Sequence, residues 1–96
     1  MKHDILVKYK AEVTKEQKIS LIPEIQELFD HTKEIPGIHE VTLYPNVVER
    51  ENRYDLLIEI DMERDALDAY DHSEWHRQWK EKYGSLLAQK AIFDHD

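Results

Sequence analysis

The sequence predicts an α+β domain in which a four-stranded antiparallel sheet carries helices on one face. Three observations predict it. Residues 3–10 and 54–61 alternate between apolar and polar side chains, as half-buried strands do. The segment after Thr14 instead repeats apolar side chains at helical spacing. Pro36 and Gly37 then end this helix, because proline disfavours helical geometry before it and glycine permits a turn.

The alternation in the strands predicts which residues face the helices. Two further strands are predicted at residues 38–44 and 89–94, with Ile92 opposite in facing to Phe93. The side chains expected on the helix-facing side are His3, Ile5, Val7, Leu56, Ile58, Ile60 and Ile92.

The first helix has a clear start and an awkward interior. Thr14 and Gln17 have the spacing of a capping box. Pro23 lacks a backbone N–H and its ring crowds the carbonyl of Ile19, which favours a kink. We expect one kinked helix; the alternative is a short first turn and a restart capped by Ser20.

The second helical region is predicted in two parts. A short helix covers residues 64–70, and Ser73 can cap a second helix that carries Trp75, Trp79 and Tyr83. The element order is strand, helix, strand, strand, broken helix, strand. This is the ferredoxin-like βαββαβ arrangement, and residues 1–96 form a single domain without repeats or linkers.

The other face of the sheet is partly apolar, and two helices cannot cover both faces. A second copy packed sheet to sheet is the simplest partner, so we expect a homodimer, in effect a dimeric α+β barrel. The interface is expected at Leu6, Leu57 and Phe93. The alternative is a half-polar solvated face, since it also carries Asp4, Lys8, Glu59 and Asp61.

Composition excludes several classes of function. The net charge of -8 argues against nucleic acid or an anionic membrane surface as partner. The chain has no cysteine, which excludes disulfides and thiol chemistry and fits a cytoplasmic protein. No apolar run approaches the length of a membrane span.

Several short motifs, in order along the whole chain, resemble the stress-responsive dimeric A/B barrel (Dabb) domain. They are Lys2-His3, Ile35-Pro36-Gly37-Ile38, Tyr54-Asp55, Tyr70 followed six residues later by His76, and Ile92-Phe93-Asp94. The resemblance implies a homodimer with a barrel-like interface and a small pocket between each sheet and its helices.

The resemblance also implies a possible chemistry. One plant member closes a linear polyketide chain without a cofactor, using a pocket histidine and a tyrosine. These roles correspond here to His76 as base and Tyr70 as oxyanion donor, with His3 nearby. The chain departs from the family at Ser73-Glu74, where histidine-proline is common, and at Leu56, where the plant member has a second histidine.

We therefore expect His3, Tyr70 and His76 to converge on a cavity for a small hydrophobic or aromatic ligand. Its walls are expected to be Ile5, Val7, Ile22, Ile58, Trp79 and Ile92. Three hypotheses remain: a non-catalytic binding protein, a cofactor-independent cyclase or lyase, and an enzyme like the antibiotic-biosynthesis monooxygenases. Alternatively, the polar residues only bond to one another or to backbone under the helix break.

No cofactor and no metal site are expected. His72 and His76 have the i, i+4 spacing of a zinc pair, but a cap at Ser73 or Asp71 places His72 before the helix, facing elsewhere. The acidic and histidine residues at positions 94–96 lie at the end of the chain, a poor place for fixed ligand geometry.

Overall fold

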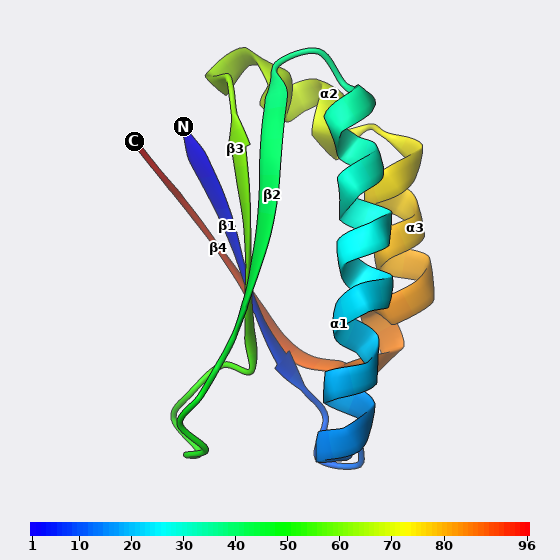
Figure 1. Cartoon of the computed structure of the whole chain (residues 1–96), viewed down its shortest axis with the longest axis vertical. Coiled ribbons are helices and arrows are strands. Elements are labelled where there is room, and N and C mark those ends of the chain that lie inside the picture. Colours follow the sequence, from blue (N-terminus) through cyan, green and yellow to red (C-terminus); the bar gives the residue numbers. More distant parts are fainter.

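The computed structural model describes residues 1–96 and has the predicted element order. The strands are β1 (Lys2–Tyr9), β2 (Ile38–Pro45), β3 (Leu56–Met62) and β4 (Leu87–His95). The helices are α1 (Lys15–Asp30), α2 (Leu67–Asp71) and α3 (Glu74–Tyr83), with short 3-10 turns η1 (His31–Glu34), η2 (Arg64–Ala66) and η3 (Gly84–Leu86). One antiparallel sheet has the order β2-β3-β1-β4, and the helices lie on one of its faces (Figure 1). The ferredoxin-like arrangement is confirmed.

The capping box of α1 is formed as predicted. The Thr14 hydroxyl accepts a hydrogen bond from the Gln17 backbone N–H, and the Gln17 side chain accepts one from the Thr14 N–H. The helix continues through Pro23 to Asp30, so the single helix is confirmed and Ser20 does not cap a restart. No helix of the chain combines the length and apolar character needed to cross a membrane.

The register of the central strands produces the core. β1 lies between β3 and β4, and it pairs His3 with Ile60, Ile5 with Ile58 and Val7 with Leu56; these side chains are buried beneath the helices. The predicted facing of these residues is confirmed. Because β4 is an edge strand, its helix-facing Ile92 is covered less and remains 47% exposed.

Two predicted strand boundaries are wrong by about two residues. β3 begins at Leu56 rather than Tyr54, although Asp55 still donates its N–H to the Val7 carbonyl, because side chains take part in the pairing before Leu56. The Asp55 carboxylate accepts from the Tyr9 N–H at 2.8 Å, and the Asn46 amide donates to the Tyr54 carbonyl at 2.5 Å. β4 begins at Leu87 rather than Gln89. The first residues of this strand do not alternate between apolar and polar side chains, so the sequence pattern does not mark its start.

The face of the sheet away from the helices is open (Figure 1). Cross-strand pairing puts Leu6 beside both Leu57 and Ala91, and Tyr44 beside Leu57. Phe93 lies on the same face and is 61% exposed. The open face therefore carries an apolar row with one prominent aromatic ring.

Candidate functional site

The break between α2 and α3 brings Tyr70 and His76 together. α2 ends at Asp71, and Ser73 begins α3 as its N-cap, accepting a hydrogen bond from the His76 N–H at 3.2 Å. The two helices thus present neighbouring rings, whose centroids lie 5.0 Å apart.

His3 reaches the same place from the start of β1. Its buried ring meets the Tyr70 ring edge-on, with centroids 5.5 Å apart. Its Nδ1 lies 2.5 Å from the Oδ1 atom of Asp94 on β4, so the N–H donates to the carboxylate. This bond orients the His3 ring and leaves Nε2 as its free nitrogen.

These three residues surround one hollow of about 260 Å³ between the β1–β4 edge and the α2–α3 region. Its lining consists of His3, Ile5, Leu67, Tyr70, Asp71, His76, Trp79, Lys90, Ile92 and Asp94. Three residues expected in its walls lie elsewhere. Val7 and Ile58 are completely buried in the core, and Ile22 lines a different hollow.

His76 is arranged as a neutral acceptor. Its Nδ1 lies 3.0 Å from the Asp71 carbonyl oxygen, so Nδ1–H donates there and Nε2 carries the lone pair. Burial lowers the pKa of His76 below its ordinary value, and the charges of Lys80 and Lys90 lower it further. The hydrogen bond to the Asp71 carbonyl raises the pKa, but it only partly offsets these effects. The ring is therefore neutral near pH 7.

Tyr70 is arranged as a donor. Its hydroxyl is buried and has no hydrogen-bond partner within the protein. Burial raises the pKa of Tyr70, and the charge of Asp71 adds to the effect. The phenol therefore keeps its proton and can donate it to an acceptor in the hollow.

A sequence model of the Stress Responsive A/B Barrel Domain matches residues 1–96. The chain belongs to this A/B barrel family. No curated protein matches the sequence significantly.

Solved structures share the A/B barrel fold at low sequence identity. A dimeric protein of unknown function with a ferredoxin-like fold, from Bacteroides fragilis, has a TM-score of 0.78 at 16% identity, covering 99% of this chain and 93% of that one. A Dabb family protein from Mesorhizobium loti has a TM-score of 0.74 at 9% identity, covering 99% and 93%. The hydroxynitrile lyase from Passiflora edulis has a TM-score of 0.72 at 12% identity, covering 98% and 89%.

Sequence reasoning missed four residues that line the hollow of this A/B barrel: Leu67, Asp71, Lys90 and Asp94. Asp94 is the most informative of them, because it pairs with His3 across β1 and β4. The ferredoxin-like fold places the first and last strands side by side. Aligning the residues of these two strands in sequence would therefore have identified Asp94 as the partner of His3.

Two other features lie outside this hollow. His72, at the end of α2, is exposed, and its Nδ1 bonds to the Asp68 carbonyl at 2.9 Å. A larger hollow of about 640 Å³ lies at the opposite end of β1, beside the β2–β3 loop. Two of its four lysines are paired with carboxylates, Lys18 with Asp55 and Lys15 with Glu49. We place the candidate site at the smaller hollow, because Tyr70 and the two imidazoles meet there.

Proposed function

We propose that this A/B barrel protein binds a small carbonyl compound with an apolar or aromatic body in the hollow lined by His3, Tyr70 and His76. The observation that carries the proposal is the buried Tyr70 hydroxyl, which has no partner within the protein and lies at a hollow with two imidazoles. A polar group left unpaired in the interior costs free energy, and a ligand acceptor removes that cost.

The hollow divides into a polar and an apolar part. The Tyr70 hydroxyl donates to the carbonyl oxygen of the ligand, and the Nε2 lone pair of His76 accepts from a separate donor group of the ligand, such as a hydroxyl. Ile5, Trp79 and Ile92 contact the apolar body. An apolar wall with a few convergent polar groups is typical of small-molecule sites.

A cofactor-independent reaction is the second candidate, favoured by the neutral state of His76 beside a buried donor. In an aldol-type closure, His76 removes a proton from the carbon next to a carbonyl, and Tyr70 donates to the enolate oxygen. That carbon then attacks a second carbonyl of the same substrate molecule, and the alkoxide that forms takes the proton back from His76, which regenerates the base. A similar fold serves a lyase in Passiflora edulis. Leu56 stands where the plant cyclase has a second histidine, so binding remains the primary proposal.

The binding proposal is tested by titrating aromatic and aliphatic aldehydes and ketones while following tryptophan fluorescence, since Trp79 lines the hollow. We expect saturable binding that weakens in His76→Ala and in Tyr70→Phe. His72→Ala is the matched control, because His72 is exposed and outside the hollow. Binding that is the same in all variants contradicts the proposed site.

Turnover of the same compounds separates the two candidates. General base catalysis contributes about 10²–10⁴-fold. If the protein is a cyclase or lyase, His76→Ala should therefore remove most product formation while its circular dichroism stays unchanged. Binding without product, by contrast, supports the non-catalytic form of the proposal.

We also propose that the protein is a homodimer formed through the open sheet face, with Leu6, Leu57 and Phe93 at the interface. The exposed Phe93 ring and the apolar row beside it support this assembly. The similar structure from Bacteroides fragilis is described as dimeric. A second copy is the partner that covers such a face most simply.

A further inference from the structure

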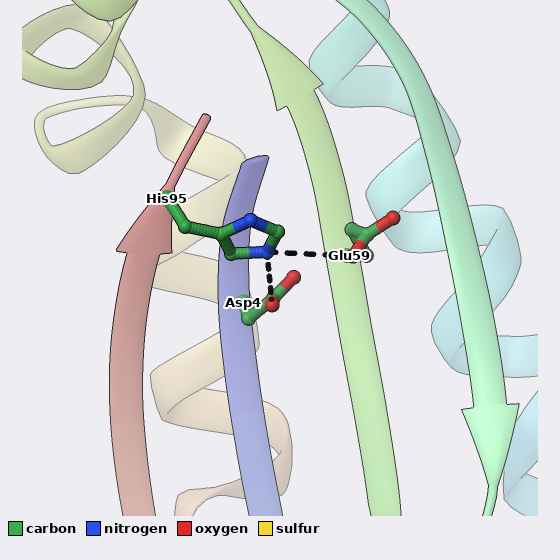
Figure 2. Close-up of side chains that lie close together, drawn as sticks. All are labelled: Asp4, Glu59 and His95. Atoms are coloured by element: carbon green, nitrogen blue, oxygen red, sulfur yellow. Dashed lines mark hydrogen bonds and ion pairs between the residues drawn. The ribbon is translucent and has the colours of Figure 1, made fainter. Parts of the chain in front are cut away.

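A second group of polar residues lies on the open face, on the opposite side of the sheet from the ligand hollow. Three neighbouring strands each supply one: Glu59 from β3, Asp4 from β1 and His95 from β4 (Figure 2). One potential ligand atom from each of these residues lies within 4.8 Å of the others. Their positions along the chain are far apart, so the cluster has no signature in the sequence.

The backbone fixes this convergence. Asp4 and Glu59 are direct cross-strand partners, and His95 is two residues beyond Phe93, the partner of Asp4 on β4. The His95 Nε2 atom lies 2.9 Å from Asp4 Oδ2 and 4.0 Å from Glu59 Oε2 (Figure 2). Side chains at such positions on adjacent strands are held by the sheet rather than by a loop.

The cluster has more acceptors than donors. Within the cluster, the Nε2–H of His95 is the one hydrogen-bond donor available to the two carboxylates. The other imidazole nitrogen lies 3.3 Å from the Asp96 carbonyl oxygen, to which it can donate. Lys2, on the same face, pairs with Asp61 at 3.2 Å.

Asp4 gives an independent sign of a missing partner. The residue is only 8% exposed, and its Oδ1 atom is buried without any hydrogen-bond partner in the protein. A buried carboxylate oxygen without a donor is costly, and a bound cation compensates for that cost.

We propose that Asp4, Glu59 and His95 form a binding site for a divalent metal ion of the zinc class. One imidazole nitrogen and two carboxylate oxygens are ligands that Zn²⁺ accepts, whereas Mg²⁺ prefers oxygen and retains its waters. Ligands of a tetrahedral zinc stand about 3.4 Å apart, given metal–ligand distances of about 2.1 Å. The observed 2.9 and 4.0 Å lie on either side of this value and all three ligand atoms lie within 4.8 Å of one another, so side-chain rotations must draw the two carboxylates around the ion.

The experiment measures Zn²⁺ binding to the metal-free full chain by calorimetry, with Mg²⁺ as a second arm. We expect one Zn²⁺ per chain and no comparable binding of Mg²⁺. In the NMR spectrum, Zn²⁺ should shift the imidazole signals of His95 and leave those of His76 in place.

Two ligand variants and one control complete the test. His95→Gln and Glu59→Gln should each weaken Zn²⁺ binding by about tenfold or more, since removing a group that merely orients a ligand already costs that much. Both residues are partly exposed within the single chain, so its fold should persist. The control is His39→Gln, because His39 pairs with Glu63 at 3.1 Å but has no third ligand beside it.

Substoichiometric Zn²⁺ binding, or equal binding in all three variants, overturns the proposal. Binding that is lost equally in His39→Gln also overturns it, because the ion then occupies ordinary surface histidines. Loss of the ligand-binding activity proposed above leaves these results unaffected, since that hollow lies on the helix-facing side of the sheet.

Discussion

The Ser73 hydroxyl donates a hydrogen bond to the Tyr70 carbonyl oxygen at 2.7 Å. The Ser73 hydroxyl oxygen also accepts a hydrogen bond from the His76 N–H at 3.2 Å, so one side chain ties together the backbones that carry both rings of the candidate site. Ser73 is therefore a positioning residue as well as a helix cap.

Ser73→Ala should lower the free energy of unfolding by about 1 kcal/mol, the usual value of a lost N-cap, and also weaken ligand binding. Thr14→Ala is the matched control, because Thr14 caps α1 outside the hollow. It should cost similar stability without affecting binding. Urea denaturation and ligand titration measure the two effects. Equal binding by both variants would show that Ser73 has no positioning role.

Tyr70→Phe should preserve or raise stability, because it removes a buried hydroxyl that has no partner in the protein. The expected gain in the free energy of unfolding is up to about 1 kcal/mol. Tyr83→Phe provides the contrast, since the Tyr83 hydroxyl donates to Glu24 at 3.2 Å and its loss should be destabilising. A marked loss of stability in Tyr70→Phe would mean that its hydroxyl already has a strong partner.

The imidazole of His76 should titrate below its ordinary pKa of 6.5 in the folded protein. Between the folded and unfolded pKa values the unfolded chain binds more protons, so stability rises with pH in this interval. The contribution of His76 is complete above 6.5 and is lost as the pH falls through the folded pKa.

NMR titration of the His76 ring in folded and urea-unfolded protein measures both pKa values. Lys80→Gln and Lys90→Gln should each raise the folded pKa, because both ammonium groups disfavour the imidazolium. A folded pKa at or above the unfolded value would contradict the assignment of His76 as a neutral base.

Sedimentation should give about twice the monomer mass of 11.5 kDa for the wild type. Phe93→Lys should shift it toward the monomer, because a charge replaces the ring at the proposed interface. Ile19→Lys is the control: Ile19 is 59% exposed, close to the 61% of Phe93, but it lies on α1 rather than on the open face. If Phe93→Lys remains dimeric, the interface lies elsewhere.

Gly37→Ala should destabilise the fold by about 1–3 kcal/mol, the cost of holding a residue in a strained backbone region. Gly37 has a φ of 95°, and an added Cβ would lie 3.0 Å from the Ala66 Cβ. Gly84→Ala should be tolerated, because its φ is -55° and nothing lies within 4 Å of its added Cβ. Thermal denaturation of the two variants compares them directly.

Local patterns in the sequence were sufficient for the elements and their facing. The shared facing of Ile5 and Val7 and the Thr14–Gln17 capping box each depend on neighbours in the chain, and both are found as predicted. Tyr70 and His76 are likewise close in sequence, so their proximity could be anticipated from the helix break.

Contacts between distant strands could not be predicted in this way. The pairing of His3 with Asp94 depends on the register of β1 and β4, and a shift of one residue would turn Asp94 to the other face. Similarly, Val7 and Ile58 were predicted to line the pocket only because they lie on the helix-facing side of their strands. Their depth beneath the helices depends on packing, which buries them beyond the hollow.

The position of β1 at the centre of the sheet has a consequence for how the chain folds. Its partners are remote: Lys2 meets Asp61 across 59 residues, and His3 meets Asp94 across 91. Only β2 and β3 pair as neighbours in sequence. Long loops must close before such contacts form, which slows folding relative to helical bundles of the same size. During synthesis, β1 therefore stays incompletely paired until β4 has left the ribosome, and its apolar side chains remain open to aggregation in that interval.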